Sequence, residues 1–174
     1  SPDEWRQLLA RVDVANEEGL RIIGQTRGRP TSTLMGFELS FNPFVECPSW
    51  QPLAGLPFAE RLPRLRDPVL RERLINEPEG SERHVRRNRH WERIFKLGNP
   101  PNYEPGLDEN VASQAAKRGI TPAALAYDWM MENGGRGILY RPTTNYASGS
   151  MDPVHEMLQH QHTLIGLGDG GAHV

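Results

Sequence analysis

The sequence has little of several features that particular protein classes need. It contains a single cysteine, Cys47, so an internal disulfide framework is excluded and a reducing compartment, the cytoplasm, is expected. No apolar run approaches the roughly 20 residues that a membrane-spanning helix needs, and we expect no membrane partner. The formal net charge is only −2, which provides no basic surface for nucleic acid.

Hydrophobic residues are also scarce, whereas proline and glycine are abundant. Hydrophobic types make up 37% of the 174 residues, beside 15 prolines and 17 glycines. This composition predicts long loops. The length suits one ordinary domain, whereas a complete (β/α)8 barrel needs about 250 residues.

Helical and apolar patterns alternate along much of the chain. An amphipathic helix that ends at Gly19 leads into the apolar run 20–26, which predicts a buried strand. Further helices are predicted at 58–76, 107–118, 121–132 and 151–159, and further strands at 91–97, 137–140 and 163–167. Apolar strands that follow helices are typical of a parallel sheet covered by helices. The pattern therefore predicts an α/β fold whose chemistry lies at the carboxyl ends of its strands.

Residues 31–105 interrupt this alternation. Four prolines and five aromatic residues are scattered over 31–58, which predicts an ordered excursion packed by its own aromatic side chains. Acids and arginines alternate over 77–90. Because the two signs balance, a solvated helical surface is favoured there over a basic contact patch.

The segment 163–174 carries the strongest functional pattern. Its apolar strand leads directly to Asp169, which has glycine on both sides. A carboxylate at the carboxyl end of a strand can take a proton from metal-bound water and return it to a leaving amine. A turn aspartate that bonds its own backbone is the alternative. His173 follows on the same edge, where it can bond the carboxylate or the substrate.

Other candidate substrate-binding residues follow predicted strands in the same way. Gln25 and Arg29 come after the strand at 20–26, and arginine can pair with a substrate carboxylate through two hydrogen bonds. Asn145 and Tyr146 come after the strand at 137–140, where an amide and a phenol can orient an acyl or carboxylate group. A surface arginine and a turn asparagine are the plain alternatives.

Two further patterns suggest other chemistry. The segment Gly166–Gly171 matches G-x-G-x-x-G, but a dinucleotide site needs a following helix, and Asp169 would add negative charge to a phosphate loop. His160 and His162 have the spacing of a metal-binding pair, but they precede the last strand. Five strand residues span about 16 Å, so these histidines cannot share an ion with Asp169. We expect them to lie at the surface or at a helix end, and we expect no metal ligand in this chain.

Several segments, taken in order, resemble the N-acyl-D-amino-acid deacylase (D-aminoacylase-like) branch of the amidohydrolase superfamily. Residues 164–174 carry the resemblance, and the other matching segments are Gly24-Gln25 with Arg29-Pro30, Asn42-Pro43-Phe44, Pro48-Ser49-Trp50, Leu65-Arg66-Asp67-Pro68 with Arg71, Tyr103-Glu104-Pro105, and Asn145-Tyr146-Ala147. The resemblance implies a zinc-dependent hydrolase of small-molecule amides in which Asp169 is the proton shuttle. The family's metal ligands match no position here, and Cys47 falls in the wrong region to be its cysteine ligand.

On this resemblance the chain is expected to be the later part of an amidohydrolase-type (β/α)8 barrel, a partial TIM barrel that spans 1–174 and contains the excursion 31–105. Zinc then belongs to the parent enzyme, and the chain alone is expected to hold none and to be inactive. The alternative is a non-catalytic module that binds a partner or associates with itself. A half-barrel exposes strand edges, so we expect a homo-oligomer on either hypothesis.

Overall fold

A computed structural model describes residues 3–77 and 81–166. The chain divides into two compact units, the first formed by residues 1–32 and 142–174 and the second by residues 33–141. The boundaries between them fall within the strands β2 (Thr31–Met35) and β4 (Leu139–Thr144). Among the described residues, no helix is long and apolar enough to cross a membrane.

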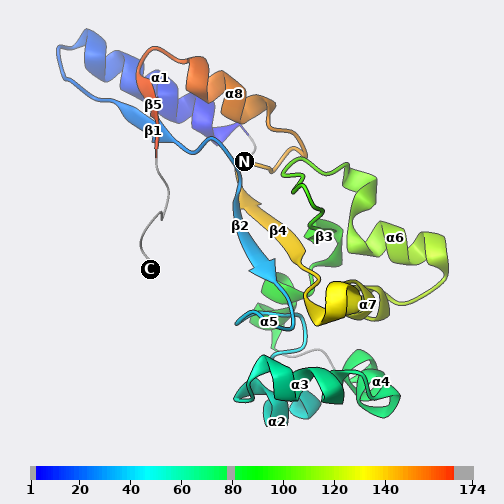
Figure 1. The fold of residues 1–174 in the computed structure, drawn as a ribbon. Coiled ribbons are helices and arrows are strands. Elements are labelled where there is room, and N and C mark those ends of the chain that lie inside the picture. Colours follow the sequence, from blue (N-terminus) through cyan, green and yellow to red (C-terminus); the bar gives the residue numbers. More distant parts are fainter. Residues whose placement is uncertain (1–2, 78–80, 167–174) are drawn as a thin grey trace. The chain divides into compact units, whose positions relative to one another are not determined.

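The described part of the first unit consists of helices and a small parallel sheet (Figure 1). Its elements are α1 (Glu4–Glu17), β1 (Gly24–Thr26), α8 (Asp152–Gln159) and β5 (Thr163–Ile165). Strands β1 and β5 are parallel, with Gly24 opposite Thr163 and Thr26 opposite Ile165. Helix α8 packs against both strands. The parallel arrangement expected of the apolar strands is therefore confirmed for this pair.

The second unit is mostly helical. Its elements are η1 (Pro48–Trp50), α2 (Gln51–Ala54), α3 (Phe58–Leu65), α4 (Pro68–Asn76), α5 (Glu82–Asn88), η2 (Trp91–Arg93), β3 (Phe95–Lys96), η3 (Leu107–Glu109), α6 (Val111–Arg118) and α7 (Pro122–Gly135). The strand order is β2-β4-β3, and β3 and β4 are antiparallel, with Phe95 opposite Tyr140.

Local sequence signals fix several helix ends. The carboxylate of Asp67 accepts a hydrogen bond from the Val69 N–H at 2.9 Å and caps α4. The hydroxyl of Thr121 accepts one from the Ala124 N–H at 3.2 Å and caps α7. Helix α6 ends where Gly119 adopts a left-handed conformation (φ +67°). The predicted end of one helix at 118 and the predicted start of the next at 121 are confirmed by α6 and α7.

An aromatic cluster forms the centre of the second unit. The ring of Phe37 stacks on Phe44 and on Trp50, with centroids 6.2 and 5.8 Å apart, and meets Tyr127 edge-on at 4.9 Å. The Tyr127 hydroxyl donates a 2.6 Å hydrogen bond to the Leu65 carbonyl, which satisfies this buried polar group. The prediction that the proline-rich excursion is packed by its own aromatic residues is confirmed for these rings.

The predicted partial (β/α)8 barrel is wrong. The described residues form a two-stranded parallel sheet and a three-stranded sheet that contains an antiparallel pair, and neither closes into a barrel. A (β/α)8 barrel requires parallel strands throughout. The apolar runs also form shorter strands than expected. The run 91–97 forms a 3-10 turn followed by two strand residues, and residues 20–23 lie outside β1.

Candidate functional site

The carboxyl ends of β1 and β5 lie side by side because the two strands are parallel. The Gly166 N–H donates a 2.7 Å hydrogen bond to the Thr26 carbonyl. A Cβ at Gly166 would lie 3.2 Å from the Gln25 Cβ. The segment that leads toward Asp169 therefore starts beside Gln25, as the predicted parallel edge requires. Asp169 and His173 themselves, and the part of the G-x-G-x-x-G segment after Gly166, lie outside the described residues.

The other predicted substrate-binding residues differ in solvent exposure and in backbone conformation. Gln25 and Arg29 are exposed. Tyr146 is buried, so its ring is not presented to solvent. Asn145 adopts a positive φ of 61°, which fits the plain alternative of a turn asparagine.

Asn145 also lines a hollow of about 390 Å³ within the first unit. Trp5 and Leu8 of α1 and Met157 of α8 line the same hollow. Among residues 3–77 and 81–166, the buried indole N–H of Trp5 finds no hydrogen-bond partner. Gln25 and Arg29 are not among the described residues that line this hollow, so the structure does not bring the predicted substrate-binding residues into one pocket.

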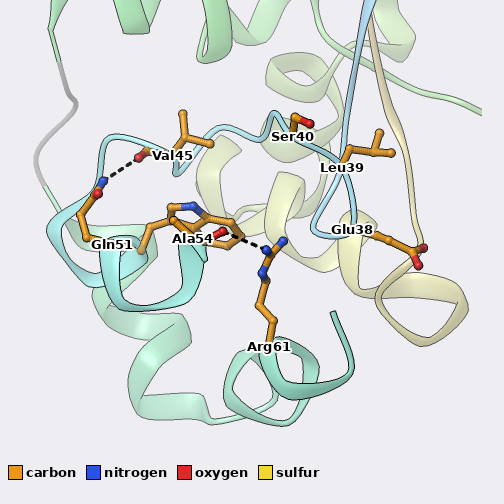
Figure 2. Close-up of a pocket in the computed structure, with 8 residues that line it drawn as sticks. Glu38, Leu39, Ser40, Val45, Gln51, Ala54 and Arg61 are labelled. Atoms are coloured by element: carbon orange, nitrogen blue, oxygen red, sulfur yellow. Dashed lines mark hydrogen bonds between the residues drawn. The ribbon is translucent and has the colours of Figure 1, made fainter. Parts of the chain in front are cut away.

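A second hollow, of about 420 Å³, lies in the second unit and contains Arg61 (Figure 2). The Arg61 guanidinium donates to the carbonyl oxygens of Phe37, Leu53, Ala54 and Leu56 at 2.7 to 3.2 Å. These carbonyls compensate the buried charge and occupy four of the five guanidinium N–H groups. Arg61 therefore ties the backbone together, and the hollow is a poor anion site.

Cys47, the single thiol, is also structural. It is buried, and desolvation raises the pKa of its thiol although the neighbouring Arg89 acts in the opposite direction. The Arg89 guanidinium donates to the Cys47 sulfur at 3.0 Å and to the Pro43 carbonyl at 2.8 Å. A buried thiol with a raised pKa is a weak nucleophile.

A cluster of one carboxylate and two imidazoles occupies the first unit. Asp13 projects from α1, while His160 follows the last residue of α8 and His162 precedes β5. The Asp13 Oδ1 lies 2.9 Å from His162 Nδ1, and its Oδ2 lies 3.2 Å from His160 Nε2. One ligand atom from each residue lies within 4.8 Å of the others. We refer to Asp13, His160 and His162 as the carboxylate–imidazole cluster.

Hydrogen bonds define the protonation of the carboxylate–imidazole cluster. His160 Nδ1 accepts from the His162 backbone N–H at 3.2 Å, so neutral His160 carries its proton on Nε2 and donates it to Asp13. The hydrogen bond from His162 is the largest influence on Asp13 and lowers its pKa. Desolvation opposes this effect, and the hydrogen bond from His160 adds to it. Asp13 is therefore an anion at neutral pH.

Sequence reasoning found the histidine pair but missed its third member. The prediction that His160 and His162 lie before the last strand, at a helix end, is confirmed, because His160 caps the C-terminus of α8. Asp13 lies 147 residues before His160 and has no motif around it. Only the contact of α1 with the turn before β5 brings these residues together.

Comparisons with known proteins identify no family for this chain. No family model, curated protein or solved structure matches it. The resemblance to the deacylase branch therefore stays a prediction.

Proposed function

We propose that this chain is part of a metal-dependent hydrolase of linear amide bonds, of the N-acyl-D-amino-acid deacylase type. The ordered sequence resemblance supports this substrate class. The observation that carries the proposal is the parallel pairing of β1 with β5. It brings the start of the segment that contains Asp169 to the carboxyl end of β1, the edge at which parallel sheets hold their reactive groups.

In this proposal Asp169 transfers the proton. Its carboxylate removes a proton from the attacking water as the C–O bond forms at the amide carbon. It then delivers the proton to the amide nitrogen as the C–N bond breaks, which releases a carboxylic acid and an amine. Arg29, exposed after β1, pairs with the carboxylate of the amino-acid part of the substrate.

The zinc implied by the resemblance does not fit the described residues of this edge. Residues 25–30 and Gly166 offer no imidazole, thiolate or carboxylate, the groups that hold zinc in proteins. Other residues of the hydrolase would have to hold the metal. The proton transfer assigned to Asp169 does not depend on where that metal lies.

The experiment measures hydrolysis of N-acetyl-D-amino acids and their L enantiomers by the whole hydrolase of which this chain is proposed to be a part. Asp169→Asn is expected to lower kcat by about 100-fold or more, since general acid–base groups contribute about 10² to 10⁴. Asp152→Asn, which neutralises an exposed carboxylate at the start of α8, is the control and should leave kcat within about twofold. Absence of hydrolysis in the unsubstituted protein, or full activity of Asp169→Asn, would overturn the proposal.

The alternative function, self-association, is favoured by a separate observation. Leu164 and Ile165 of β5 are 61% and 74% exposed, and the adjoining Ile23 is also exposed. Within the described residues β1 and β5 pair only with each other, which leaves the outer edge of each strand open for a further strand. A second copy of the chain could extend the sheet and cover these side chains.

Light scattering after gel filtration tests the self-association function. An oligomer is expected at micromolar concentrations, and Ile165→Asp should dissociate it. Val69→Asp, a substitution of another exposed apolar residue, in α4, is the control. A monomer at all concentrations, or equal dissociation by both substitutions, would exclude assembly through β5.

A further inference from the structure

The carboxylate–imidazole cluster has no role in the proposed amide chemistry. It offers one carboxylate oxygen and two imidazole nitrogens from partly buried residues of α1 and of the turn before β5. We infer that Asp13, His160 and His162 form a binding site for a divalent cation of the zinc type. This inference is independent of the proposed hydrolase function.

The spacing of the three groups suits one ion. Ligands about 2.0 to 2.1 Å from zinc in a tetrahedral site lie about 3.3 Å from one another. The Asp13 oxygens lie 2.9 and 3.2 Å from the two histidine nitrogens, and no ligand atom is more than 4.8 Å from another. Small side-chain rotations are therefore enough to bring all three groups to one ion.

The backbone holds the two histidines close together independently of the ion. The Gly24 N–H donates to the His162 carbonyl at 2.8 Å, and the Thr163 N–H donates to the His160 carbonyl at 3.1 Å. The Thr163 hydroxyl also donates to the His160 carbonyl at 3.0 Å. The site is thus largely formed before binding, which lowers the conformational entropy that an ion must offset.

Binding requires a defined movement of protons. The ion takes the lone pair of His160 Nε2, so the His160 proton moves to Nδ1, and the 3.2 Å hydrogen bond from the His162 N–H is lost. His162 binds through Nδ1, so the proton that this nitrogen donates to Asp13 moves to Nε2. Each imidazole stays neutral and Asp13 stays an anion, so two neutral histidines and one carboxylate face the cation.

The donor set and its exposure favour zinc over magnesium or calcium. Imidazole nitrogens suit zinc, copper and nickel, whereas magnesium and calcium select oxygen ligands. The side chains are 22% and 25% exposed for the two histidines and 35% for Asp13. Solvent can therefore reach the ion, and water can complete a coordination shell that has three protein ligands.

This site differs from the proposed proton-transfer edge. His160 and His162 precede β5, whereas Asp169 follows it. In a pair of parallel strands, both amino ends lie at one end of the sheet and both carboxyl ends lie at the other end. An ion in the carboxylate–imidazole cluster joins α1 to the turn between α8 and β5, and therefore stabilises these three elements.

The test is a zinc titration of the purified 174-residue chain, without an affinity tag and after treatment with a chelator. Calorimetry is expected to give one zinc per chain. Asp13→Asn and His162→Ala should each weaken binding at least about 100-fold, since loss of even an outer-shell partner costs about 10- to 100-fold. His155→Ala, which removes an exposed histidine of α8 bonded to Gln159 outside the cluster, is the matched control and should bind as the unsubstituted chain does.

Nitrogen NMR of the imidazoles provides a readout that does not depend on how well the variants fold. In the unsubstituted chain zinc should move the His160 proton from Nε2 to Nδ1 and shift the ring resonances of His162, while His90 and His155 stay unchanged. Unchanged His160 and His162 resonances would overturn the inference. Equal zinc affinity in Asp13→Asn, or equally tight binding of magnesium, would overturn it as well.

Discussion

The two units of this chain are stabilised in different ways. Residues 33–141 enclose an aromatic and aliphatic core in which even a buried arginine has its N–H groups committed to carbonyls. In the first unit α1 has no buried residue, and Tyr146 and Val154 are the buried apolar side chains among its described positions, prolines aside. The excursion 31–105 therefore packs with helices α6 and α7 into one core. The unit that contains the candidate functional groups has fewer buried apolar side chains among its described residues, so the proposed ion or second copy would add to its stability.

Truncating one leucine in each unit tests the difference between the two units most strongly. Leu65→Ala removes a buried side chain of the second unit and should lower the free energy of unfolding by about 2 to 5 kcal/mol, because it leaves a cavity. Leu8→Ala removes an exposed side chain of α1 and should cost less than about 0.5 kcal/mol. Urea unfolding followed by circular dichroism measures both. Equal losses in the free energy of unfolding would mean that the side chains of α1 are buried as well as those of α3, and would contradict the difference between the units.

A pair of arginines tests the polar interior of the second unit. Arg61→Ala leaves four carbonyls without their donor and should cost about 2 kcal/mol or more. Arg136→Ala breaks an exposed ion pair with Glu38, at 3.0 Å, and should cost about 0 to 1 kcal/mol. The same urea measurement applies. A cost for Arg61→Ala no larger than that for Arg136→Ala would show that the guanidinium is dispensable.

Two asparagines with positive φ give the smallest expected effects. Asn133 in the second unit has φ 51° and Asn145 in the first has φ 61°. Replacement by alanine should cost about 1 kcal/mol at each site, whereas glycine should change stability by less than about 0.5 kcal/mol. If Asn145 also binds substrate, Asn145→Gly should raise KM without lowering stability. A large loss of stability with glycine would contradict the turn role of that residue.

Local features of the fold could be predicted from the sequence because their causes lie within a few residues. The caps at Asp67 and Thr121 and the helix end at Gly119 each depend on a side chain or a glycine beside the backbone that it satisfies. The aromatic packing of the excursion was also predictable, since Phe37, Phe44 and Trp50 lie within 14 residues of one another.

Long-range features could not be predicted in this way. Nothing near Asp13 indicates that it contacts two histidines, the nearer of which in the sequence, His160, lies 147 residues further along the chain. The barrel was predicted from the resemblance and the parallel sheet from apolar runs, but apolar character does not decide whether a run pairs in parallel or antiparallel fashion. The segment 91–97 accordingly forms a turn and a two-residue strand that is antiparallel to β4.

Hydrogen exchange of the tag-free chain with and without zinc tests the central claim most directly, since it reads both units at once. The account predicts that zinc slows exchange of the backbone amides of α1, α8 and β5 and leaves those of residues 33–141 unchanged. Slower exchange throughout the chain, or no change in α1, would contradict a cation site built from Asp13, His160 and His162.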